Sequence, residues 1–320
     1  MASYALRRLL ALLPTLVVIS MVVFGVIRLI PGNQAAALLG LEASPEAMAQ
    51  AAARLGLDKP LISQYWHWTC GLFRGDLGTS IFFRDSVSIV ILEHLGPTVS
   101  LALLAEIFAL FIALPGGVLA AWRRGRTADM ALRILSVLGA SVPGFLMALF
   151  LMLIFAVKLR WLPVAGYREL DQGLLAHLRF LILPALALGL VQAALMLRMT
   201  RSSLIGALSQ DPIRTARAKG VPERLVLWRH GLRLGALPIL TALGQSFGSL
   251  ITGAVVIETI FNIPGMGQLV THAIIRRDVV VVQAVLLVLT LICAGLNLAV
   301  DLLYGAIDPR VRARQRGEAK

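Results

Sequence analysis

Apolar residues form six runs that are each long enough to cross a lipid bilayer. The runs cover Leu9–Ile27, Val99–Trp122, Ile134–Val157, Phe180–Leu197, Leu234–Ile257 and Val279–Val300. A membrane-spanning helix needs about 17–25 mostly apolar residues, and only the second run contains a charged residue, Glu106. The pattern therefore predicts an all-α polytopic membrane protein with six transmembrane helices.

The distribution of basic residues predicts the orientation of these spans. Six spans place both termini on one side, and with cytoplasmic termini 19 Lys and Arg residues lie inside against 11 outside. The first run follows Arg7 and Arg8 as a signal peptide would, but its length favours an uncleaved anchor. The net charge of +13 is concentrated in short segments beside spans, so topology and anionic lipid explain it better than nucleic-acid binding does.

A polar, basic segment, residues 198–237, separates the fourth and fifth runs and is predicted to be cytoplasmic. Asp211 suits a helix N-cap, Pro212 suits the first helical position, and Gly220 suits the residue that ends a helix. The eight residues between Asp211 and Gly220 would form a helix that is marginal in water by itself. We therefore expect an external partner to receive it, with a solvated amphipathic connector as the alternative.

The segments outside the runs carry interfacial features. A surface helix is expected from Ser44 to Gly56, and the cluster Tyr65-Trp66-His67-Trp68 is typical of an anchor at the membrane interface. The apolar stretch Leu269–Ile275 is too short to cross and predicts a re-entrant or interfacial segment. Five of the six runs contain a helix-breaking proline, which favours a bundle around a pathway.

Several kinds of chemistry are absent from the sequence. None of the four lysines follows a glycine, so no Gly-Lys-Ser/Thr phosphate loop exists and ATP hydrolysis by this chain is not expected. His67 and Cys70 have helical spacing, but a metal site generally needs three or four ligands, so we predict no metal site. Cys70 and Cys293 fall in an outer segment and a span, so no disulfide between them is expected.

Polar residues in or beside the spans are the candidates for a pathway or gate. We assign this role to Glu106, Gln245, Ser249, Glu258 and Asn262. A carboxylate within a span belongs to a proton relay, pairs inside the bundle, or lines a hydrated path. Glu258 lies at a span end, where water or headgroups reach it, so a structural role comes first there. A proton-coupled secondary transporter that uses Glu106 remains an alternative class, as does a membrane scaffold or receptor.

Motifs along nearly the whole chain resemble the membrane subunits of bacterial binding-protein-dependent ABC importers, and more narrowly the first permease of the dipeptide/oligopeptide/nickel group. The matching segments are Tyr4–Pro14, Leu55–Pro60, Arg74–Ser80, Trp161–Pro163, Asp211–Gly220, Arg229–Arg233, Val256–Phe261, Pro264–Gly267 and Asn297–Arg310. The general permease signature has Glu-Ala-Ala before its glycine and Ile-x-Leu-Pro after it. Here Arg214-Thr215-Ala216 and His230-Gly231-Leu232-Arg233 stand at those places, as is usual in the peptide/nickel branch.

The resemblance implies an ABC type I importer permease-like fold and a coupling helix that docks into an ATPase subunit. That helix comprises Asp211, Ile213, Arg214, Thr215, Ala216, Arg217, Ala218, Lys219 and Gly220. Ile213, Ala216, Arg217 and Gly220 share one face, which we interpret as the docking face, and Arg214 and Arg217 would donate hydrogen bonds to the ATPase. No catalytic residue is expected in this chain.

The resemblance also implies partners, cargo and domain organisation. Residues 1–95 would be the first span with a periplasmic segment, residues 96–310 a five-helix permease core, and residues 311–320 a basic cytoplasmic tail. The partners would be a second homologous permease, two ATPases that use ATP and Mg²⁺, a periplasmic or lipid-anchored binding protein, and membrane lipid. This chain would bind no cofactor itself. The expected location is the bacterial inner membrane, and the expected cargo is peptide, with nickel or another small solute as the alternative.

Overall fold

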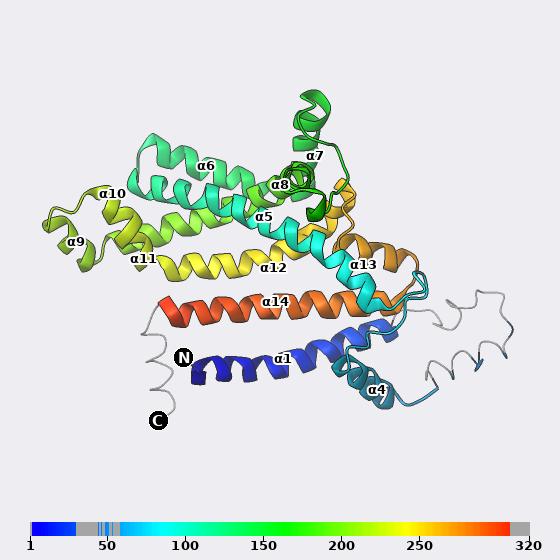
Figure 1. Cartoon of the computed structure of the whole chain (residues 1–320). Coiled ribbons are helices and arrows are strands. Elements are labelled where there is room, and N and C mark those ends of the chain that lie inside the picture. Colours follow the sequence, from blue (N-terminus) through cyan, green and yellow to red (C-terminus); the bar gives the residue numbers. More distant parts are fainter. Residues whose placement is uncertain are drawn as a thin grey trace. The chain divides into compact units, whose positions relative to one another are not determined.

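The computed structural model describes residues 2–29, 44, 46, 49–50, 53 and 58–307, and its regular elements are helices (Figure 1). Among these residues the only β-type pairing is an isolated bridge between Thr79 and Ser86. The chain divides into two compact units, one built on residues 97–263 and 296 onward, the other on residues 2–96 and 264–295. The surface helix expected from Ser44 to Gly56 falls largely outside the described residues, as does the basic tail.

The first unit contains the helices between the second and fifth apolar runs. Its elements are α5 (Val87–Trp122, from Pro97 on), α6 (Thr127–Ser141), α7 (Gly144–Leu151), a π-helical turn (Met152–Lys158), α8 (Leu174–Leu208), α9 (Asp211–Ala218), α10 (Glu223–Leu225), α11 (Leu232–Leu234), α12 (Ala236–Phe261) and the end of α14 (Val279–Ile307). α8 packs against α6, α7 and α12. Its buried leucines Leu181 and Leu183 share a core with Leu101 of α5 and Leu250 of α12. α8 is therefore the central helix of this unit.

Length and composition identify four helices able to cross a membrane, or five if one bent pair counts as a single span. The bent pair is α6 with Gly144–Lys158, which meet at an angle of 102°. The helix of the first run, α1 (Ala2–Leu29), is not among them. Its stretch Leu10–Gly25 belongs with the shorter apolar helices of 10–17 residues. The structure thus agrees with a polytopic all-α protein but leaves the count of six spans a prediction.

Most prolines in or beside the apolar runs leave their helices continuous. Pro14, Pro97, Pro115 and Pro184 lie inside continuous helices. Only Pro143 accompanies a break, where Val142 adopts an extended conformation (φ −82°, ψ 123°) before α7. A residue before proline is biased toward extended backbone, and here the bundle accepts that bend.

α5 and α8 approach each other so closely that α8 requires a glycine at the point of contact. A Cβ built on Gly189 of α8 would lie 2.7 Å from the backbone oxygen of Ala105. Backbone atoms cannot rotate away as a side chain does, so a larger residue would push the two helices apart. Small residues at such crossings allow the close packing that stabilises helix pairs in membranes.

Gly189→Ala is therefore expected to lower the free energy of unfolding by about 1–3 kcal/mol, the usual cost of overpacking. Gly206→Ala, in the same helix, is the matched control, because nothing lies within 4 Å of its added Cβ. Alanine favours a helix by about 0.5–1 kcal/mol over glycine, so this control should be neutral or stabilising. Thermal unfolding of the purified protein in detergent measures both, and equal melting temperatures would contradict the close approach.

In the second unit, α1 packs against α4 (Leu61–Phe73), the helix that carries the predicted aromatic anchor. The hydroxyls of Ser20 and Tyr65 are hydrogen-bonded at 2.7 Å, and the ring of Phe24 lies 5.4 Å from Tyr65 and 5.7 Å from Trp68. Trp66 is 68% exposed. Two of the cluster's aromatic residues, Tyr65 and Trp68, thus pack α4 against α1, and the anchoring of the cluster at the membrane interface stays a prediction.

A buried carboxylate ties the loop after α4 to the start of α14. Asp278 is 1% exposed and accepts hydrogen bonds from Ser80 Oγ at 2.5 Å and from the Phe82 amide at 3.1 Å.

Between α12 and α14 in the sequence lies α13 (Met266–Ile275), which includes the short apolar stretch predicted to be too short for a span. Its ten residues agree with that prediction.

Candidate functional site

The predicted cytoplasmic helix is present as α9, with boundaries shifted by one residue. Gln210 is its N-terminal flanking residue, in extended conformation (φ −80°, ψ 154°), and Asp211 already lies inside the helix. The prediction of Asp211 as the N-cap is therefore wrong, although an acid in the first turn still interacts favourably with the helix dipole. Gly220 has a φ of +74°, which confirms its predicted role in ending the helix.

The apolar face of α9 packs on its own chain. Ile213 is fully buried and Ala216 is 7% exposed, and both belong to a small core with Val226. The flanking Leu208 and Val221 pack against the same core. This corrects the assignment of Ile213 and Ala216 to the docking face: they fasten α9, and the opposite face is the one presented.

The exposed face of α9 is polar and cationic. Arg217 donates two hydrogen bonds to Glu223, at 2.7 Å from Nη2 and 3.1 Å from Nε, and this pairing raises the pKa of the Arg217 guanidinium. Arg214 is 77% exposed and its nearest acid, Asp211, is 3.8 Å away. Of the two arginines predicted to face a partner, Arg217 is thus engaged within the chain, and Arg214 is left to bind outward.

The segment around α9 is more helical than the sequence pattern predicts. α8 continues beyond its apolar run to Leu208, so residues 198–208 of the predicted loop are helical. At the other end of the predicted loop, α12 begins at Ala236.

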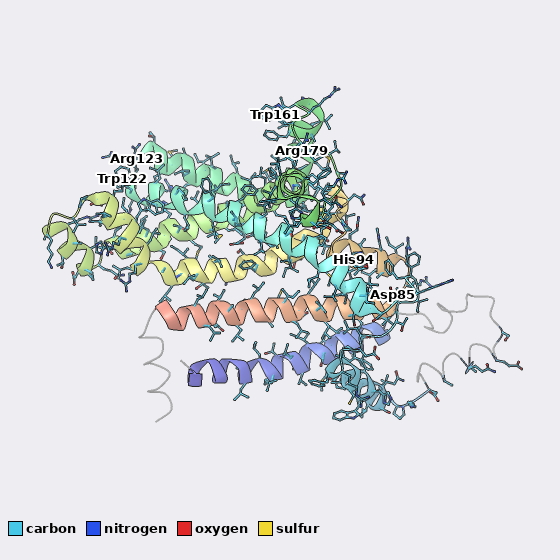
Figure 2. The ribbon with its side chains drawn as sticks, viewed as in Figure 1. Asp85, His94, Trp122, Arg123, Trp161 and Arg179 are labelled. Atoms are coloured by element: carbon cyan, nitrogen blue, oxygen red, sulfur yellow. The ribbon has the colours of Figure 1, made fainter. Side chains whose placement is uncertain are left out.

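Trp122 and Arg123, at the end of α5, lie toward the same end of this unit as α9 and α10, and Trp161 lies at the other end (Figure 2). The Arg123 guanidinium is 5.4 Å from the Trp122 ring centroid. Tryptophans at both ends are typical of a protein that crosses two interfaces.

A second candidate site is a pocket of about 550 Å³ between α8 and α12. Its lining residues are Gln192, Leu195, Met196, Arg198, Met199 and Ser202 of α8 with Ala242, Gln245, Ser246 and Ser249 of α12. Gln192 donates a hydrogen bond to Ser249 Oγ. Two of the predicted pathway residues, Gln245 and Ser249, are therefore brought together here, beside amide and hydroxyl groups suited to hydrogen-bonding a polar solute.

Glu106 lies behind this pocket, on α5. Its side chain is 4% exposed, and Ser246 Oγ donates a hydrogen bond of 2.7 Å to its Oε2. The other oxygen, Oε1, is buried without a hydrogen-bond partner in the structure. Glu106 thus contacts the pocket through Ser246 and does not line it.

Glu258 and Asn262 lie elsewhere, at the end of α12. Glu258 is fully buried and accepts a hydrogen bond of 2.6 Å from Thr98 Oγ1 of α5, so the expectation that water or headgroups reach it is wrong. α12 continues past Glu258 to Phe261, and this extra turn carries the carboxylate into the packing. Asn262 ends the helix with a left-handed φ of +50°, a conformation that asparagine tolerates well.

Sequence reasoning missed two features of these sites. Gln192 is the one amide in the fourth apolar run, and that isolated polar residue was the signal for the pocket. The second is an ion pair: Arg201 of α8 donates to both carboxylate oxygens of Asp129 in α6, at 2.6 and 2.9 Å. Seventy-two residues separate the partners, and no sequence pattern predicted the pair.

For metals, no cluster of three His, Cys, Asp or Glu side chains occurs within the described part of the chain.

Comparison with known proteins identifies the family. Residues 113–313 match the model for the binding-protein-dependent transport system inner membrane component, and residues 1–102 match the model for the N-terminal part of such components. The chain belongs to this family. It is accordingly a multi-pass protein of the bacterial inner membrane, the permease component of an ABC importer.

Curated relatives of this permease family match over almost the whole chain. A protein of Sinorhizobium fredii described as a probable peptide ABC transporter permease is 40% identical over 98% of this chain and 100% of its own length. The glutathione transport system permease protein GsiC of Salmonella choleraesuis is 41% identical, and that of an Escherichia coli O6:H1 strain is 38% identical. Both alignments cover 98% of this chain and 99% of the relative.

A solved structure shares the fold. The inward-facing MetNI methionine ABC transporter contains a chain that superposes with a TM-score of 0.56 at 17% sequence identity. The superposition covers 68% of this permease and 96% of that chain. The all-α importer permease fold expected from the sequence is thereby confirmed.

Proposed function

We propose that this permease forms part of the translocation pathway of an ATP-driven importer that carries peptides delivered by a binding protein. Two relatives that align end to end with it are named for peptide and glutathione transport, and glutathione is itself a small peptide. The pocket between α8 and α12 offers Gln192, Gln245 and Ser249 to a solute rich in amide groups. Nickel or another small solute remains the alternative cargo.

In this proposal the chain is a non-catalytic subunit with six spans and cytoplasmic termini. A second permease completes the pathway, membrane lipid surrounds the pair, and two cytoplasmic ATPases bind ATP and Mg²⁺. The observation that carries the proposal is α9: Ile213 and Ala216 are buried on their own chain, so the opposite, exposed face is the one available to an ATPase. Closure of the ATPases would move α9, and with it α8 and α12, and would thereby alternate the access to the pathway.

The test is uptake into proteoliposomes that contain the complete complex and its binding protein. ATP supplied on the side of the membrane where the ATPase subunits lie should drive accumulation of a labelled peptide. Replacing the ATPase subunits with a variant that is unable to hydrolyse ATP should abolish this accumulation. Labelled Ni²⁺ in a parallel assay separates the two cargo classes. Peptide uptake that needs no ATPase subunit would overturn the proposal.

The proton-coupled alternative is separated by Glu106→Gln. The amide still accepts the Ser246 hydrogen bond but cannot carry a charge or release a proton. We expect this variant to retain ATP-driven uptake, and an uncoupler to leave uptake intact while ATP is present. A secondary transporter that uses Glu106 would instead lose uptake in the variant and in the uncoupled wild type.

A further inference from the structure

A second pocket of about 520 Å³ lies between α6 and α8, and neither the family nor the proposed pathway assigns it a ligand. It is lined by Met130, Arg133, Ile134, Ser136, Val137 and Leu138 of α6 with Arg198 and Arg201 of α8. The pocket thus combines three guanidinium groups with a largely apolar wall. That combination suits an amphipathic anion.

The three arginines are not equally available. Arg201 is held by both oxygens of Asp129, which is 1% exposed. Arg133 is 54% exposed, and its Nε lies at 3.6 Å from the same carboxylate. Within the described residues, no hydrogen bond or ion pair engages Arg198. Three arginines against one carboxylate leave an excess of two positive charges, carried by Arg133 and Arg198.

Most of the apolar wall lies further along α6 than the charge. Met130 and then Arg133 come first after the basic loop that starts at Arg123, and Ile134, Val137 and Leu138 follow. At 1.5 Å per residue, Leu138 lies roughly 7.5 Å further along the helix than Arg133. On α8, which ends at Leu208, Arg198 directly follows the apolar run Phe180–Leu197. The arginines therefore mark the membrane surface on both helices, and the apolar wall lies deeper.

We propose that this pocket binds an anionic phospholipid of the cytoplasmic leaflet. The phosphate would lie between Arg133 and Arg198, and one acyl chain would follow Ile134, Val137 and Leu138 into the bilayer. Basic pockets between helices on the cytoplasmic side are known to suit such headgroups. The inference rests on the orientation in the proposed function, which places the start of α6 in the cytoplasm.

Two other occupants fit the pocket less well. A peptide cargo would leave its polar backbone against the apolar wall, and the α8–α12 pocket offers it amides and hydroxyls instead. Only Arg198 lines both pockets. An apolar helix of the second permease would cover the wall but leave two arginines unneutralised, which is costly in a membrane.

The test measures which lipid the assembled complex retains. The complex is reconstituted in equimolar phosphatidylglycerol and phosphatidylcholine, extracted, washed, and its bound lipid quantified. Two excess charges should enrich phosphatidylglycerol over phosphatidylcholine by about thirtyfold. Arg133→Gln with Arg198→Gln should reduce the ratio to that of the bulk lipid, while the Asp129–Arg201 pair keeps the helices together.

Arg124→Gln with Arg126→Gln is the matched control, because it removes two charges from the adjacent loop outside the pocket. This control should retain the enrichment. Val137→Trp, which fills the apolar wall without changing charge, should lose it. Excess inorganic phosphate should not displace the lipid, because phosphate gains nothing from the wall.

Three results would overturn the proposal: no enrichment in the wild type, as expected if the second permease covers the pocket; equal loss in the pocket and control variants; or displacement by phosphate. The lipid ratio is measured without transport. Failure of peptide uptake with the ratio intact would therefore count against the proposed function alone.

Discussion

Ala218→Trp is expected to abolish ATP-driven uptake while leaving the protein folded and inserted. Ala218 lies on the exposed face of α9, three and four residues after Thr215 and Arg214. An indole at this position would keep the face from closing on a partner groove, whereas the core of Ile213, Ala216 and Val226 would be untouched. Loss of coupling to below a tenth of the wild-type rate needs only about 1.4 kcal/mol of lost docking energy.

Three measurements are needed for this variant: peptide uptake in proteoliposomes, co-purification of the ATPase subunits, and thermal unfolding. Ala218→Ser is the matched control, since it changes polarity at the same place without adding bulk, and it should retain uptake. If Ala218→Trp binds its ATPases and transports at the wild-type rate, α9 is not the docking element.

Asp129→Ala is expected to destabilise the fold more than any other substitution of a polar residue considered above. The change removes both hydrogen bonds that Arg201 donates and leaves its guanidinium, 21% exposed, without a counter-ion between α6 and α8. Removing one partner of a buried ion pair costs about 3–5 kcal/mol, and the lower end applies here because Arg201 is partly exposed. The Gly125 amide, which donates to Asp129 at 3.0 Å, also loses its acceptor.

A double variant without either charge separates the ion pair from other effects of this substitution. Asp129→Ala with Arg201→Leu removes both charges, so it should be more stable than Asp129→Ala alone. Asp129→Asn keeps the shape of the side chain and part of its hydrogen bonding, so its stability should lie between that of the double variant and that of Asp129→Ala. Thermal unfolding in detergent gives the order, and a double variant no more stable than Asp129→Ala would show that the pair contributes little.

The elements with strong local signals were predictable. Five apolar runs coincide with long helices or with the bent pair α6–α7, because an apolar run of sufficient length has few alternatives to a membrane helix. α9 could be found from Pro212 and Gly220, since proline and glycine restrict where a helix begins and ends. The orientation of α9 could not, because two apolar residues on one face do not reveal whether that face packs on the same chain or on a partner.

For the prolines and the carboxylates, the local sequence did not predict the structure. Pro115 and Pro184 look alike in sequence to Pro143, yet only the last lies at a break, because neighbouring helices decide whether a bend is accommodated. Glu258 looks exposed at the end of an apolar run, but one further helical turn buries it against Thr98. These outcomes depend on packing between helices that are distant in the chain.

By itself, the sequence determined that this is an all-α membrane protein without a nucleotide-binding loop, and it placed a short basic helix between two spans. Those properties follow from composition and from residue types that constrain the backbone locally. Only the tertiary structure decided which face of α9 is free, that Ser246 stands between Glu106 and the α8–α12 pocket, and that Asp129 binds Arg201. The reason is physical: these arrangements arise from the simultaneous packing of several helices, and burial and pairing are properties of that packing rather than of any one segment.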